Sequence, residues 1–347
     1  MKLWRLEAFR GLAALYIVIS HVLGNDYFFL RFGQEAVMVF FMMSGFVIEY
    51  SFQKSRYKNF SNYFLKRFLR IYPVLILMFI VVALIQQPNF QSPKFLKHVL
   101  GNLLMLQDFR SGKPNVVVPA LFSSALWSLH YQWWHYMFYY PINQLLQRRH
   151  QAIVVGSVGV VATLLYFAHP NFVFRLWIYF PIWWVGVEMA RSFLQYKRVR
   201  AQDLKISIIA LLIIAGLLIA DTTLFIAQGN AYSFGIHPFL ETRHFAAAIA
   251  AIIASLAWQR WHWIGFEYLK FGVALAPISY SLYIAHQPLL ANSHYLGFIQ
   301  NPWLEQCLYL VILLLFCYGA EIKLTTFLRS KLEQPSFRAL KAKVFSK

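Results

Sequence analysis

Acidic residues and charged residues of both signs are scarce in this chain of 347 residues. It has 13 aspartate and glutamate residues against 32 lysine and arginine residues, and charged residues make up only 13% of the sequence. A soluble protein has about 25% charged residues. With 59% hydrophobic residues and a mean hydropathy of +0.52, the composition excludes an ordinary soluble enzyme. Apolar segments recur along the chain to its C-terminal region, which predicts an all-α, polytopic integral membrane protein.

Cysteine is also scarce. The two cysteines, Cys307 and Cys317, lie in one apolar segment, and in a helix they would be ~15 Å apart, too far for a disulfide. No cysteine metal motif is present, and we expect no bound metal. The net charge of +19 would suit nucleic acid binding, but cytoplasmic loops of membrane proteins are enriched in lysine and arginine. We therefore expect no nucleic acid partner.

The apolar segments predict about ten transmembrane helices, at 11–30, 34–51, 71–87, 124–145, 151–168, 172–191, 205–221, 243–258, 277–296 and 303–322. Residues 94–107 are amphipathic and short, which indicates a re-entrant or interfacial helix. Both termini are then cytoplasmic, and only seven of the 32 basic residues lie outside, as the positive-inside rule requires. We expect one transmembrane domain at 1–325 and a basic cytoplasmic tail at 326–347. The first helix lacks a small-residue cleavage site and is expected to be retained.

Two ionisable residues bracket the first apolar run, Arg10 and His21. Eleven helical steps return His21 to within ~20° of the Arg10 side, ~16 Å further along the axis. Arg10 would then lie at a membrane boundary, and His21 near the middle of a ~30 Å hydrocarbon core. Ionisable groups at such depth are costly unless they are paired or face a polar cavity. Together with His130, His135 and His286 on later spans, His21 predicts a polar interior.

Five motifs, in order along the chain, give it a resemblance to the acyltransferase-3 family, whose members are membrane O-acyltransferases that modify glycans and lipid-linked sugars. The matching segments are 6–21 (an Arg-x10-His signature), 33–46 (a phenylalanine-rich Ser-Gly-Phe motif), 66–73 (Arg-x-x-Arg), 126–129 (Trp-Ser-Leu) and 278–286 (a late Ser-Tyr…His motif). One position departs from the pattern, because Gln132 stands where the family usually has a glutamate. Either that glutamate is structural, or Glu35 or another carboxylate replaces it, or the activity is altered.

The resemblance implies transfer of an acyl group from cytoplasmic acyl-CoA, most often acetyl-CoA, to a hydroxyl of a lipid-linked or cell-surface saccharide. A hydroxyl needs a positioned base with a pKa near 7, which is the range of histidine. His21 would be the general base, or would itself accept the acyl group before transfer; we favour the first role. Glu35 is the candidate catalytic carboxylate.

The resemblance also suggests a donor site and a substrate cavity. Arginine binds phosphate oxygens through a rigid fork, so the CoA phosphates are expected at Arg10, Arg67 and Arg70. The expected cavity residues are Ser44, Gln132, Tyr280, Tyr283 and His286. Gly45 is expected to allow two helices to approach closely.

Acyl-CoA, a glycan or glycolipid acceptor and membrane lipids are the expected partners, in a bacterial cytoplasmic (inner) membrane with the N-terminus in the cytoplasm. Two other functions stay open. Buried histidines would also suit a transporter or flippase that relays protons. The glutamine at position 132 keeps a catalytically silent membrane binding or assembly protein possible.

Overall fold

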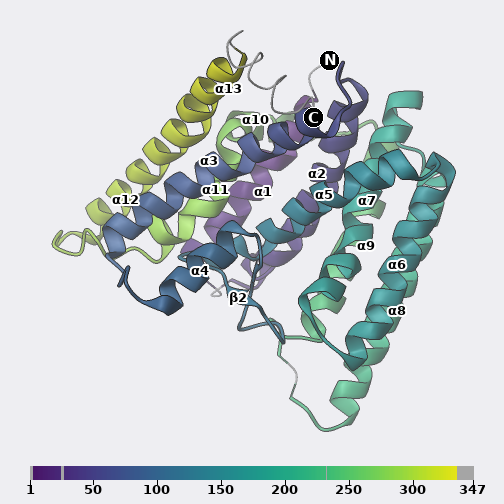
Figure 1. The fold of residues 1–347 in the computed structure, drawn as a ribbon, viewed down its shortest axis with the longest axis horizontal. Coiled ribbons are helices and arrows are strands. Elements are labelled where there is room, and N and C mark those ends of the chain that lie inside the picture. Colours follow the sequence, from purple (N-terminus) through teal and green to yellow (C-terminus); the bar gives the residue numbers. More distant parts are fainter. Residues whose placement is uncertain (1–2, 25–26, 232, 334–347) are drawn as a thin grey trace. The chain divides into compact units, whose positions relative to one another are not determined.

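The computed structural model describes residues 3–24, 27–231 and 233–333, which are mainly helical (Figure 1). The described strands are β1 (Gln107–Asp108) and β2 (Val118–Pro119), which pair in parallel. The chain divides into two compact units. Unit 1 comprises residues 1–30, 56–91 and 269–347, and unit 2 comprises residues 31–55 and 92–268. The all-α class is confirmed, whereas the predictions for Lys2 and for tail residues 334–347 lie outside the described residues.

Unit 1 is built on α1 (Trp4–Val22), which packs against α10 (Gly272–Leu275), η5 (Ala276–Ile278) and α11 (Ser279–His286). The approach is close because glycines meet: a side chain on Gly11 would overlap the carbonyl oxygen of Gly272. Alongside lie η1 (Phe28–Leu30), α3 (Phe60–Gln86), α12 (Pro302–Cys317) and α13 (Thr325–Glu333). Both cysteines lie on α12 and are unpaired, as predicted.

Two helices of unit 1 continue into π-helical segments, η6 (Gln287–Ala291) after α11 and η7 (Tyr318–Leu324) after α12. In η6 the backbone N–H of Asn292 donates to the carbonyl of Gln287 at 2.8 Å, five residues back. Pro288 lies inside this segment. Proline has no N–H and its ring clashes with the carbonyl four residues before it, so the wider π turn relieves a local conflict.

Unit 2 is centred on α2 (Gly33–Gln53) and α7 (Phe172–Tyr196). A side chain on Gly45 would overlap the carbonyl oxygen of Trp183, and one on Gly186 would overlap that of Met42. The predicted role of Gly45 in a close helix approach is therefore confirmed. In Figure 1, α6 (Arg148–Ala168) runs between α7 and α8 (Lys205–Ala227), with α9 (Phe239–Arg260) beside α8. The remaining segments are α4 (Pro93–Leu103), η2 (Ser124–Ser128), α5 (Leu129–Leu145), η3 (Ala201–Leu204) and η4 (Phe266–Leu269).

Helices occur at every position where the sequence predicts one, including a short amphipathic helix, α4, near 94–107. Among the described residues, seven helical stretches are long and apolar enough to cross a membrane. These are Phe28–Gln53, Phe60–Gln86, Arg148–Ala168, Phe172–Tyr196, Ala201–Ala227, Phe239–Arg260 and Pro302–Lys331. An integral membrane protein is therefore supported, while ten crossings and cytoplasmic termini stay predictions.

Several helices begin or end some residues away from the predicted spans, and two of these differences are the largest. The first helix ends at Val22 instead of residue 30, because Gly24 adopts the left-handed conformation (φ 68°) that commonly ends a helix. His21 consequently lies in the last turn of α1 and not at the centre of a longer helix. The third helix begins at Phe60 instead of residue 71, because the Asn59 side chain caps it by accepting a hydrogen bond from the Asn62 N–H at 3.0 Å.

Candidate functional site

His21 and His286 come together in unit 1. Their ring centroids are 4.9 Å apart, with the planes inclined at 57°. Nδ1 of His21 lies 2.9 Å from the carbonyl oxygen of Ile17, and Nδ1 of His286 lies 2.8 Å from that of Tyr283. A carbonyl oxygen only accepts hydrogen bonds, so each neutral ring carries its proton on Nδ1 and has an unprotonated Nε2. Two rings that can each accept a proton are therefore neighbours.

The two histidines differ in accessibility. His21 is exposed, whereas His286 is completely buried. Nε2 of His286 has no hydrogen-bond partner among the described residues. The His21 ring is thus the member of the pair that a substrate can reach.

The tyrosines predicted beside His286 point to different neighbours. Tyr283 is buried, and its ring centroid lies 6.3 Å from that of His286. Tyr280 donates a hydrogen bond to the carbonyl of Ile71 on α3 at 3.1 Å. Only Tyr283 therefore accompanies the histidine pair, while Tyr280 connects α11 to α3.

Arg10 lies eleven residues before His21 on the same helix, as the sequence predicts. It is half-buried, and its guanidinium donates to the carbonyl of Ala276 at 2.6 Å. This bond lies one position before Gly11, where α1 approaches α10 most closely. Arg10 therefore helps to fix α1 against the segment that leads into α11.

Arg67 and Arg70 lie one turn apart on α3 and have separate partners. The Arg67 guanidinium lies 5.5 Å from the Tyr63 ring centroid. Arg70 forms an ion pair with Oε1 of Glu321 at 2.5 Å. Oε2 of Glu321 accepts hydrogen bonds from the N–H and hydroxyl of Ser281, both at 2.8 Å. Glu321 in η7 thus links α3 to α11, and a common anion for both arginines stays a prediction.

Glu35 lies in the first turn of α2 in unit 2 and is buried. It forms an ion pair with Arg243 of α9. The Arg243 guanidinium also lies 3.2 Å from the Phe234 ring centroid. The observed partner of this carboxylate is an arginine, and a catalytic role for Glu35 stays a prediction.

Ser44 and Gln132 are brought together through a third residue, Tyr136. The Ser44 hydroxyl is 2.9 Å from the Tyr136 hydroxyl, which donates to Oε1 of Gln132 at 3.3 Å. Both predicted cavity residues are half-buried. The glutamine is therefore an acceptor in a short polar chain, a role that its amide can fulfil without changing protonation.

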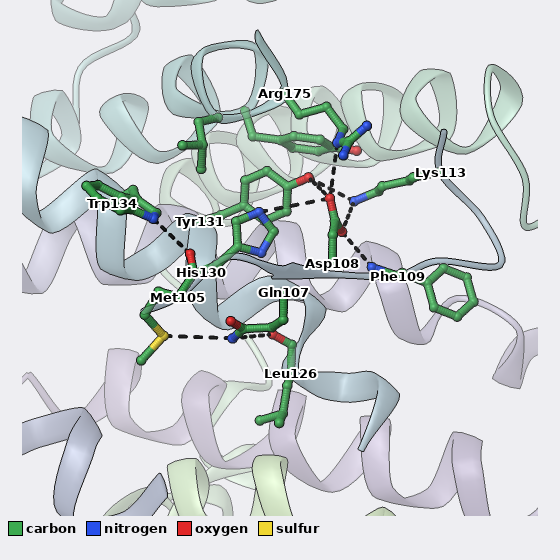
Figure 2. A network of polar contacts seen from close by, with 12 residues as sticks. Met105, Gln107, Asp108, Phe109, Lys113, Leu126, His130, Tyr131, Trp134 and Arg175 are labelled. Carbon is green, nitrogen blue, oxygen red and sulfur yellow. Dashed lines mark hydrogen bonds and ion pairs between the residues drawn. The ribbon is translucent and has the colours of Figure 1, made fainter. Parts of the chain in front are cut away.

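Asp108 is the centre of a buried ion cluster in unit 2 that the sequence did not predict. Figure 2 shows Lys113, Tyr131 and Arg175 pointing toward its carboxylate. Oδ1 accepts from the Phe109 N–H at 2.7 Å and from Nζ of Lys113 at 3.2 Å. Oδ2 accepts from the Tyr131 hydroxyl at 2.9 Å and from Nε of Arg175 at 3.1 Å. All four sites of this carboxylate are therefore occupied.

The electrostatic balance of this cluster favours ionised Asp108. Burial opposes its charge, but the positive charges of Lys113 and Arg175 hold its pKa at about 2. Nζ of Lys113 also lies 4.2 Å from the Trp127 ring centroid, within cation–π range. Nε2 of His130 lies 4.0 Å from Oδ2, and neither of its ring nitrogens has a hydrogen-bond partner among the described residues. The cluster ties the segment from β1 to β2 to helices α5 and α7.

A second charged cluster joins α2 to α7. Nε of Arg191 lies 3.1 Å from Oε1 of Glu49, and the Tyr139 hydroxyl donates to Oε2 of Glu49 at 2.6 Å. NH1 of Arg191 pairs with Glu188 at 2.9 Å. These side chains supply hydrogen-bond donors and acceptors to one another, which indicates a structural role.

Sequence reasoning missed Asp108, Lys113, Arg175 and the partner of Arg70. The available signal was general: in a chain with 13 acidic residues, each buried carboxylate needs a cation. Which cation it takes depends on contacts between distant segments, such as Arg70 with Glu321. Among the described residues, no group of three or more histidine, cysteine, aspartate or glutamate side chains could hold a metal ion.

Comparisons with known proteins identify the family. No curated protein and no solved structure matches the chain. A family model described as an acyltransferase domain, that of the acyltransferase-3 family, matches residues 3–322. The match includes α1 with Arg10 and His21, α3 with Arg67 and Arg70, and α11 with His286. The chain therefore belongs to the acyltransferase-3 family and is a membrane acyltransferase.

Proposed function

We propose that this acyltransferase moves an acyl group, most often acetyl, from cytoplasmic acyl-CoA to a hydroxyl of a lipid-linked or cell-surface saccharide. One observation carries the proposal: the His21 ring is exposed, and its Nδ1 is held by the Ile17 carbonyl at 2.9 Å. Its Nε2 is therefore unprotonated in the neutral ring and accessible to a hydroxyl. By the sequence resemblance, His21 is also the histidine of an Arg-x10-His pattern.

His21 is the general base of the proposed reaction. Its Nε2 takes the proton of the acceptor hydroxyl while that oxygen attacks the thioester carbonyl carbon. The new C–O bond forms, the C–S bond breaks, and the departing CoA thiolate takes the proton from Nε2. A positioned base of this kind contributes ~10²- to 10⁴-fold to the rate.

The donor phosphates are assigned to Arg10, Arg67 and Arg70. Arg67 and Arg70 lie in the first half of α3, and Arg10 lies in the first half of α1. Guanidinium groups suit CoA phosphates because they offer paired donors and stay charged. Within unit 1 the acceptor side is assigned to Tyr280 and Tyr283, beside the buried His286, while Ser44 and Gln132 of unit 2 stay predicted cavity residues. The proposed co-substrate is acyl-CoA, without a metal. The proposed location is the bacterial cytoplasmic membrane with the N-terminus inside.

The proposal is tested with purified protein in liposomes, labelled acetyl-CoA and a membrane glycan extract. Wild-type protein should place covalent label in the glycan. His21→Ala should lose at least ~100-fold in rate, while His294→Ala, an exposed histidine of the same unit, should keep the wild-type rate.

Other outcomes separate the competing functions. Label that enters the liposomes without covalent transfer would favour a transporter, and neither result would favour a silent protein. Acid-quenched label on the protein that is lost with His21→Ala would favour an acyl-histidine intermediate. Full activity of His21→Ala would exclude His21 as the base.

A further inference from the structure

The His21–His286 pair contains a buried acceptor without a donor. His286 is completely buried, and its Nε2 has no hydrogen-bond partner among the described residues. Its Nδ1 is held by the Tyr283 carbonyl at 2.8 Å, so the ring cannot present a proton on Nε2 in its neutral form. A buried polar atom without a partner is costly, so this nitrogen of His286 calls for an explanation.

The nearest ring that could supply a donor is His21, with its centroid 4.9 Å away. In its neutral form His21 has the same tautomer, with Nδ1 on the Ile17 carbonyl. Two unprotonated Nε2 atoms cannot hydrogen-bond to each other. A proton added to Nε2 of His21 changes this, because the imidazolium is a donor at both nitrogens.

We infer that His286 is a positioning residue that accepts a hydrogen bond from Nε2–H of His21 once His21 has taken the substrate proton. This inference rests on the proposed function of His21 as the base. A single proton is involved: it leaves the acceptor hydroxyl, resides on Nε2 of His21 beside Nε2 of His286, and passes to the CoA thiolate when the C–S bond breaks. His286 stabilises the protonated intermediate and exchanges no atom with substrate.

The backbone around His286 supports this assignment. His286 is the last residue of α11, and the π-helical segment η6 begins at Gln287. The Nδ1 bond to Tyr283 fixes the ring, and burial prevents substrate from reaching it. His286 can therefore act only through His21.

The test compares three substitutions at His286 by steady-state kinetics. In His286→Gln, the amide oxygen can still accept a hydrogen bond near the Nε2 position. In His286→Asn, the shorter amide keeps a donor for the Tyr283 carbonyl but does not reach His21. His286→Ala removes both groups. Because hydrogen bonds to charged groups are strong, we expect kcat to fall ~10- to 100-fold in the alanine and asparagine variants, with KM unchanged for acyl-CoA and acceptor. His286→Gln should stay within ~3-fold of wild type.

The results that overturn the inference are specific. Wild-type kcat in His286→Ala, or a glutamine variant as impaired as the alanine variant, would exclude the hydrogen-bond role. A change in KM with constant kcat would indicate substrate binding instead.

A second measurement does not depend on folding of the variants. Nitrogen-15 NMR of histidine-labelled wild-type protein should show both neutral rings protonated on Nδ1, and a proton on Nε2 of neutral His286 would overturn the inference. Failure of wild-type protein to label the glycan would instead overturn the proposed function. Activity lost in His21→Ala but kept in His286→Ala would leave that function intact and remove only this inference.

Discussion

The Asp108 cluster of unit 2 and the histidine pair of unit 1 each contain a completely buried ionisable side chain, Asp108 and His286, but the two side chains differ in how many hydrogen bonds they form. Asp108 accepts four hydrogen bonds, two of them from the cations Lys113 and Arg175. The histidine pair leaves Nε2 of His286 without a partner among the described residues. A carboxylate whose hydrogen-bonding positions are all occupied cannot accept a further hydrogen bond during a reaction. We therefore assign a structural role to the Asp108 carboxylate and propose a chemical role for the histidine pair.

The largest expected effect comes from removing the carboxylate of Asp108. Asp108→Ala leaves Lys113 and Arg175 buried without their anion, and breaking a buried pair in this way costs about 3–5 kcal/mol. We expect a large fall in Tm measured in detergent, together with a nearly unchanged kcat for the protein that stays folded. His21→Ala should show the reverse, with wild-type Tm and lost activity. Loss of catalysis without loss of stability in Asp108→Ala would contradict a structural role for Asp108.

Arg70 belongs to unit 1 and already has an anionic partner, Glu321, so a structural role and a role in donor binding must be separated by experiment. If Arg70 also binds a donor phosphate, Arg70→Ala should raise KM for acyl-CoA ~10-fold or more, since hydrogen bonds to charged groups are worth about 1.5–3 kcal/mol. Lys66→Ala on the same helix is the control, because Lys66 is exposed and should leave KM unchanged. A fall in Tm with unchanged KM would mean that Arg70 has only a structural role, through its ion pair with Glu321.

The low pKa of Asp108 predicts how stability depends on pH. The folded pKa of about 2 lies below the ordinary value of 3.8, so its stabilisation is present above pH ~4 and is lost as pH falls through ~2. The loss is about 2 kcal/mol by linkage. Thermal unfolding of wild type and Asp108→Asn between pH 5 and pH 2 measures it. The difference in the free energy of unfolding between the two proteins should become smaller toward pH 2. A difference that does not change with pH would contradict an ionised Asp108 in the folded protein.

The smallest effect is expected where α2 and α7 meet. A methyl group on Gly186 would overlap the Met42 carbonyl oxygen, so Gly186→Ala should cost about 1–2 kcal/mol through forced separation of the helices. Gly216 on α8 has no atom within 4 Å of the same position. Gly216→Ala should therefore be neutral or stabilising, because alanine favours helix over glycine. Equal Tm values for the two variants would mean that the α2–α7 contact does not limit stability.

The sequence was sufficient for the local features of the fold. Apolar segments located the helices, and small residues such as Gly45 predicted close packing. His21 and His286 were expected to share a polar interior, and the structure places them together. Helix ends were less predictable, because the stop after Val22 depends on the conformation of one glycine.

Long-range pairing could not be predicted. Asp108 meets Arg175 across 67 positions of sequence, through an irregular segment with no periodicity. Arg70 finds Glu321 from a different helix, although its sequence context pointed only to phosphate. Such partners depend on the three-dimensional packing of helices, which hydropathy and spacing do not encode.

The π-helical segment after His286 has a consequence for protein engineering. A π turn accommodates one residue more than an α turn, so η6 gives the C-terminal end of this helix a wider turn than α-helical geometry would. Deleting one residue between 287 and 291 together with Pro288→Ala would convert this last turn to α-helical geometry. His286 precedes the segment and would keep its orientation, while Leu289 and Leu290, both buried, would rotate to a different face. The orientation of His286 is therefore independent of the orientation of Leu289 and Leu290. The two can be redesigned separately.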